Sequence, residues 1–162
     1  MFRWMAVLWL SMMVPATGAE RAEAEEVYVP LMQDWAADAA LARQRGIPLL
    51  VLMAADYCSY CQYIEKHFLK PMIISGDYRD KVIIRVFYID GFTPVKDFDG
   101  RSVMPDEVAA RYQVTLTPTV LLLGPHGEEL AQRLVGISSK DFYGAYLDQR
   151  IETAREKMRA AG

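Results

Sequence analysis

The sequence predicts a single α/β domain, in which a central mixed sheet of four to five strands is flanked by helices on both faces. Helical and strand patterns alternate along the chain, and turn residues separate them. Strands separated by helices imply parallel crossovers, whereas the Gly-Pro-His-Gly turn at 124–127 implies that the last two strands form an antiparallel hairpin. With 162 residues, 52% of them apolar, the chain is long enough for one packed domain. The net charge of −3 gives no electrostatic reason for a nucleic-acid partner.

The first elements of the domain are a helix, a strand and a second helix. Asp34–Arg45 is Ala-rich and predicts a helix that Gly46 closes. Leu49–Met53 is a continuous apolar run, which indicates a strand buried on both faces. Ser59–Lys70 predicts a helix that stops at Pro71. The two cysteines of the chain lie where this strand passes into this helix.

The rest of the domain begins with a strand over 81–89. Residues 91–105 follow as a long loop rich in Gly, Pro and Asp, and loops of this length in compact domains usually carry function or mobility. This loop is therefore the candidate for contact with a specific partner. Further elements are predicted as a short helix, two strands and a closing amphipathic helix, at 106–112, 120–123, 132–135 and 139–161.

Residues 1–19 have the pattern of an export signal. Arg3 supplies a positive charge, an apolar run of about 11 residues follows, and small residues precede a cleavage point near Ala19. The run is shorter than the roughly 20 apolar residues of a bilayer span, so we expect cleavage. A membrane-anchored protein is the alternative if the segment stays uncleaved. The mature domain would then comprise residues 20–162 and lie outside the reducing cytosol, where disulfides persist.

Cys58 and Cys61 are the only cysteines, and their spacing admits three interpretations. A structural zinc site needs four ligands, and neither His67 nor His126 is suitably spaced to complete one, so no metal site is predicted. A disulfide that closes so short a loop stabilises a fold little. Soft thiolates suit Cu(I), so a non-catalytic copper-binding or redox-sensing module remains the alternative to a redox enzyme.

The redox interpretation has a direct physical basis. Cys58 would lie at a helix N-terminus, where unpaired N–H groups and the helix dipole favour its thiolate. Cys61, one turn further, would be better buried and placed to resolve a mixed disulfide between Cys58 and a substrate. Asp56 and Glu65 are the nearby carboxylates that could shuttle protons, although a solvated surface role is the favoured expectation for each.

A second motif, Leu116-Thr117-Pro118-Thr119, precedes a predicted strand. With the strand-Cys-x-x-Cys-helix unit, it makes residues 30–155 resemble the thioredoxin superfamily, and in particular periplasmic thioredoxin-like proteins of the SoxW type. The resemblance implies a thioredoxin fold and a cis bond before Pro118, which would face the cysteines. Thr117 would offer its backbone to an extended substrate segment. The residues beside the nucleophile would also contact substrate, namely Tyr57, Ser59 and Tyr60.

The resemblance further implies a periplasmic thiol–disulfide oxidoreductase that needs no organic cofactor or metal, because its electrons are carried by the Cys58–Cys61 disulfide. Protein disulfides would be its substrates, and a membrane thiol-electron transporter would supply electrons, which favours a reductase over an oxidase or an isomerase. A monomer is expected, because no dimerisation segment is visible. One departure stands out: thioredoxin has a buried Asp six residues before its first cysteine, where this chain has Leu52.

Overall fold

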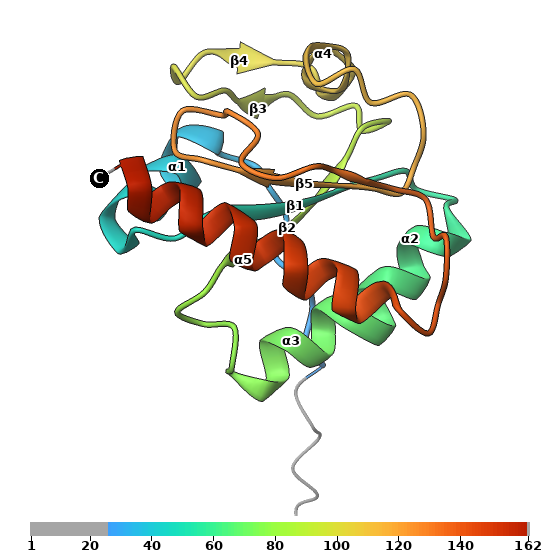
Figure 1. Cartoon of the computed structure of the whole chain (residues 1–162). Coiled ribbons are helices and arrows are strands. Elements are labelled where there is room, and N and C mark those ends of the chain that lie inside the picture. Colours follow the sequence, from blue (N-terminus) through green and yellow to red (C-terminus); the bar gives the residue numbers. More distant parts are fainter. Residues whose placement is uncertain (1–25, 162) are drawn as a thin grey trace, which may run out of the picture.

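A four-stranded sheet lies at the centre of the structure, a computed structural model that describes residues 26–161 (Figure 1). Its strand order is β2-β1-β5-β6, in which β1 and β2 are parallel and the other two ladders are antiparallel. The strands are β1 (Leu49–Ala54), β2 (Ile83–Tyr88), β5 (Thr119–Leu123) and β6 (Leu134–Val135). The predicted mixed sheet is confirmed, with four strands. The predicted export signal at 1–19 lies outside the described residues.

Strand β5 runs opposite to β1 and β2, which corrects the expectation that strands separated by helices are parallel. The connection from β2 to β5, residues 89–118, contains a small hairpin and helix α4 (Pro105–Arg111). It returns the chain to the edge of the sheet at which β2 ends, so β5 begins there. As a result, Met53 near the carboxyl end of β1 pairs with Thr119 at the start of β5.

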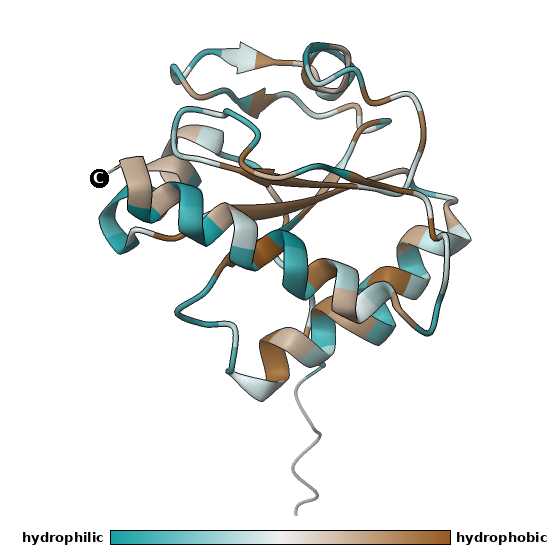
Figure 2. Cartoon of the chain, in the orientation of Figure 1, coloured by the Kyte–Doolittle hydropathy of each residue, from teal (hydrophilic) through white to brown (hydrophobic). Residues whose placement is uncertain are grey.

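Two apolar clusters pack on opposite faces of the sheet, and alternate residues of β1 belong to each. The even-numbered residues of β1 join a cluster that includes side chains of α5 (Tyr143–Ala161), and the odd-numbered residues join one that includes α1 (Trp35–Arg45) and α4. The strands of the central sheet are largely apolar, whereas the helices alternate between apolar and polar residues (Figure 2). All six residues of β1 are buried, as the continuous apolar run predicts.

The helix after the cysteines does not stop at Pro71, so that prediction is wrong. It continues through α2 (Ser59–Ile64), the π-helical turn η1 (Glu65–Leu69) and α3 (Lys70–Ser75). Proline has no N–H to donate and its ring crowds the preceding turn of a regular helix. The turn before it is widened, because the Lys70 N–H bonds to the Glu65 carbonyl five residues back. The helix ends at Gly76, which has a φ of 75°.

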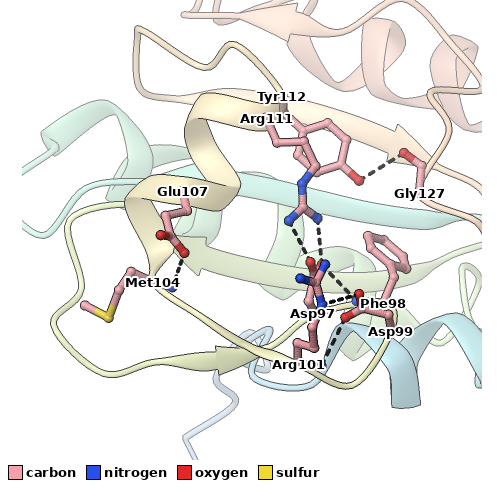
Figure 3. Close-up of polar contacts among 9 residues, drawn as sticks. All are labelled: Asp97, Phe98, Asp99, Arg101, Met104, Glu107, Arg111, Tyr112 and Gly127. Atoms are coloured by element: carbon pink, nitrogen blue, oxygen red, sulfur yellow. Dashed lines mark hydrogen bonds and ion pairs between the residues drawn. The ribbon is translucent and has the colours of Figure 1, made fainter.

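The segment 91–105, predicted as a loop without regular structure, contains a short hairpin. Strands β3 (Val95–Lys96) and β4 (Ser102–Val103) pair antiparallel, and β3 also forms a bridge to Asp34 ahead of α1. Figure 3 shows how the hairpin is tied to α4: both oxygens of Asp97 accept hydrogen bonds from Arg111. These contacts hold most of residues 91–105 in a fixed position next to α1 and α4 (Figure 1).

The closing helix α5 begins at Tyr143, four residues later than predicted. Its buried residues keep the expected spacing, at Tyr143, Leu147, Ile151 and Ala154. Residues 139–142 instead approach the helix as a turn. Among residues 26–161, no helix is both long and apolar enough to cross a membrane.

Candidate active site

The two cysteines form a disulfide at the junction of β1 and α2, with their Cα atoms 5.2 Å apart. Their exposure differs. Cys61 is 1% exposed and belongs to the cluster on the α5 face of the sheet. Cys58 is only half-buried against the same cluster. A substrate sulfur can therefore approach Cys58, whereas Cys61 is shielded.

Cys58 occupies the N-cap position of α2. Its extended backbone conformation lets its Sγ accept a hydrogen bond from the Cys61 N–H at 3.2 Å, and its carbonyl accepts the first helical bond, from the Gln62 N–H, at 3.1 Å. N–H groups and the positive end of a helix dipole stabilise a thiolate relative to a thiol. The strand-to-helix junction predicted from the sequence thus gives Cys58 a nucleophile's environment.

The loop before Cys58 is held by Asp90, which no sequence motif marks as a functional residue. Both carboxylate oxygens of Asp90, two residues after the end of β2, accept the Asp56 N–H, at 3.0 and 3.2 Å. The side chain of Asp56 itself is exposed. Asp90 was visible in the sequence only as the residue that ends a strand, and its partner lies 34 positions away. The contact between Asp90 and Asp56 could therefore be predicted only with knowledge that β1 and β2 pair in parallel.

The residues around Cys58 that were predicted to contact substrate are exposed. Tyr57 is 97% exposed, Tyr60 is 56% exposed, and Ser59 lies between the cysteines with its side chain in solvent. Tyr57 therefore does not pack against the sheet edge. These three residues form an open surface around the half-buried sulfur.

The Thr117–Pro118 segment lies at the same edge of the sheet as the cysteines, because β5 begins where β1 ends. The Thr117–Pro118 peptide bond is cis. The Pro118 carbonyl accepts the Gly136 N–H at 2.8 Å, and the Thr119 hydroxyl donates to the Leu116 carbonyl at 2.7 Å. Within residues 26–161, the Thr117 backbone makes no hydrogen bond of its own. Its N–H and carbonyl therefore have no backbone partner among these residues, at the end of the sheet where the cysteines lie.

Glu65 differs from the solvated carboxylate that was expected. It follows Cys61 by one helical turn and is half-buried, and the hydroxyl of Tyr88, the last residue of β2, lies 3.3 Å from its Oε1. Burial raises the pKa of Glu65, and the Tyr88 hydrogen bond and the charge of Lys70 oppose that shift. The position that carries a buried Asp in thioredoxin is occupied by Leu52, which is fully buried.

The described residues contain no group of three or more His, Cys, Asp or Glu side chains arranged to hold a metal ion. A Cys-x-x-Cys disulfide at the N-terminus of a helix that follows a strand of a mixed sheet is the arrangement of a thiol–disulfide redox protein of the thioredoxin fold. The family model of the thioredoxin-like domain matches residues 35–151, and the chain belongs to this family.

Solved thioredoxins have the same fold. Thioredoxin NaTrxh from Nicotiana alata is 25% identical over 83% of this chain and 98% of its own, with a TM-score of 0.54. Poplar thioredoxin h is 18% identical over 76% and 96%, with a TM-score of 0.55. Mitochondrial thioredoxin 3 from Saccharomyces cerevisiae is 20% identical over 76% and 93%, with a TM-score of 0.51. No curated protein sequence matches the chain.

Proposed function

We propose that this protein is an exported reductase of protein disulfides, in which Cys58 is the nucleophile and Cys61 the resolving thiol. The observation that carries the proposal is the unequal exposure of two bonded sulfurs, one half-buried at a helix N-terminus and one buried behind it. A structural staple needs no such inequality. A Cys-x-x-Cys bridge also closes too short a loop to stabilise the fold much.

The reaction has two exchanges. In the reduced protein, the Cys58 thiolate attacks one sulfur of a substrate disulfide, which forms a mixed disulfide and releases the other substrate sulfur as a thiolate. Cys61 then attacks the Cys58 sulfur, so the Cys58–Cys61 bond forms and the second substrate sulfur leaves. The substrate gains two electrons and two protons. The protein loses them and needs no organic cofactor.

Substrate contacts in this proposal come from both sides of Cys58. The free N–H and carbonyl of Thr117 pair with an extended segment of substrate, in the manner of an added strand, while Pro118 keeps the segment beside the sulfur. Tyr57 and Tyr60 supply exposed aromatic surface, and Ser59 faces solvent between the cysteines. Such contacts suit unfolded or flexible protein segments that carry a disulfide.

In this proposal the protein is localised in the periplasm, like proteins of the SoxW type. Its support is the pattern of residues 1–19, which ends in a cleavage point near Ala19. A membrane thiol-electron transporter would return the disulfide to the dithiol. The protein would act as a monomer, because resolution by Cys61 is complete within one chain.

Reduction of an insulin-type disulfide by dithiothreitol, with the mature chain as catalyst, tests the proposal. We expect turnover with wild type and none with Cys58→Ser. Stoichiometric retention of Cu(I) without turnover would instead identify a metal-binding module. The reduction potential then separates the redox roles: a value near about −270 mV supports a reductase, and one near about −120 mV an oxidase.

A further inference from the structure

We propose that Glu65 accepts the proton of the Cys61 thiol when Cys61 resolves the mixed disulfide. This inference rests on the proposed function and assigns one of its proton transfers to a side chain. A buried thiol must lose its proton before it can attack, because the thiolate is the nucleophile. Cys61 is 1% exposed, so bulk water reaches it poorly once a substrate covers Cys58.

The position of Glu65 on the helix places it beside Cys61. The Glu65 N–H bonds to the Cys61 carbonyl, so the two residues are one turn apart and share a face. Helical side chains lean toward the N-terminus of the helix, which is the direction in which Cys61 lies from Glu65. The strand position that would offer an alternative carboxylate holds Leu52, in the same apolar cluster as Cys61.

The surroundings of Glu65 make its carboxylate a stronger base than that of an exposed glutamate. The charged and titratable groups around it are Tyr88 at the end of β2, Lys70 at the start of α3, and the carboxylates of Asp56 and Asp90, which act on Tyr88. Burial raises the pKa of Glu65 above its ordinary value. A carboxylate with a raised pKa is the stronger base, and base strength increases proton transfer as long as the group remains ionised.

The step balances as follows. The Cys61 proton moves to a Glu65 oxygen, directly or through one water, and the Cys61 sulfur attacks the Cys58 sulfur. The Cys58–Cys61 bond forms, the bond from Cys58 to the substrate sulfur breaks, and the electron pair leaves with the substrate thiolate. When the disulfide is reduced again, the proton returns from Glu65 to Cys61.

The test measures attack and resolution separately. The reduced full-length or mature protein, in slight excess over dithiodipyridine, is mixed with this reagent. Attack by Cys58 releases one thiopyridone, and resolution by Cys61 releases a second. Absorbance in stopped flow gives both rates across the acidic and neutral pH range. Acid quenching and mass spectrometry count the mixed disulfide. We expect Glu65→Gln to slow resolution about 100-fold and to remove the acidic limb of its pH profile. The attack phase should change less than about twofold, which a general structural defect would not produce.

Two further variants sharpen the test. Tyr88→Phe removes a hydrogen bond that lowers the pKa of Glu65, so the acidic limb of resolution should move to higher pH while the limb itself remains. Glu156→Gln makes the same charge change at an exposed position on α5 and should leave both phases unchanged. Wild type that stops at the mixed disulfide would overturn the proposed function, and this inference with it. Wild type that resolves, with Glu65→Gln resolving at the same rate and pH dependence, would overturn this inference alone.

Discussion

Replacing Arg111 with alanine should destabilise the domain by about 3 kcal/mol, because it removes the cation that is hydrogen-bonded to the buried carboxylate of Asp97. Asp97 is 3% exposed and accepts two hydrogen bonds of 2.6 Å from the Arg111 guanidinium (Figure 3). Its remaining direct donor is the Phe98 N–H at 2.8 Å. Loss of one partner of a buried pair costs about 3–5 kcal/mol, and the lower end applies because the Arg111 side chain is itself 43% exposed.

Urea denaturation of the mature chain measures this change directly. In a chain that begins at Glu20, Trp35 is the sole tryptophan, and its ring lies 5.4 Å from that of Phe98, next to Asp97. Its fluorescence therefore reports both global unfolding and the surroundings of the hairpin. The double variant Asp97→Ala/Arg111→Ala removes both charges and should be less destabilised than the sum of the two single variants. A loss below about 1 kcal/mol in Arg111→Ala, or strict additivity, would refute the reasoning.

The pH dependence of the same difference has a definite sign. The hydrogen bonds from Arg111 lower the pKa of Asp97 below its unfolded value of about 3.9. The stability from this interaction is therefore present above that unfolded value and is lost as the pH falls through the folded pKa. Wild type and Arg111→Ala should differ fully at neutral pH and converge in acid. A constant difference down to about pH 2 would contradict the assignment.

Three further predictions concern the cysteine site and the core beside it. Tyr143→Phe should raise the free energy of unfolding by about 1 kcal/mol, because the buried Tyr143 hydroxyl has no hydrogen-bond partner among the described residues; urea denaturation would show a midpoint unchanged or lowered if this is wrong. Asp90→Ala should cost about 1.5 kcal/mol through loss of the charge-assisted bonds to the Asp56 N–H, whereas Asp90→Asn, which keeps an acceptor, should cost less; equal losses in the two variants would show that the bond contributes little. When Cys61→Ser reacts with a disulfide substrate, it should accumulate a mixed disulfide between Cys58 and the substrate that survives acid quenching. If mass spectrometry finds only the free Cys58 thiol, Cys58 is not the nucleophile.

Strand β1 and the cysteine pair after it were predictable because they depend on short-range patterns, whereas the antiparallel direction of β5 was not. A continuous apolar run bounded by Gly46 and Pro48 identifies β1, and a Cys-x-x-Cys after such a strand must begin the next helix. The amphipathic spacing of α5 is equally local, although its start is not: residues 139–142 were predicted as helix but turn before α5 begins at Tyr143. Local propensity does not fix where packing starts a helix.

The features that sequence reasoning missed depend on contacts between distant segments. The hairpin within 91–105 is held by the contact of Asp97 with Arg111 of α4 and by the bridge of β3 to Asp34 ahead of α1, and the pattern of residues 91–105 alone contains neither partner. The helix continues through Pro71 because a π-helical turn precedes the proline, and Leu69 and Met72 on either side of it are buried.

In the active site, too, some features follow from local sequence and others depend on contacts between distant segments. The positions of the sulfurs follow from the motif, since Cys58 is the N-cap residue of α2 and Cys61, three residues later, lies inside the helix and is buried. The polar groups around the cysteines do not follow from the motif. Glu65 comes from the helix, while Tyr88 and Asp90 come from the end of the neighbouring parallel strand β2. Burial of Glu65 depends on that pairing, so the same carboxylate would be solvated on an isolated helix. The sequence therefore indicates where electrons are held, and the fold determines which group can receive the proton that moves with them.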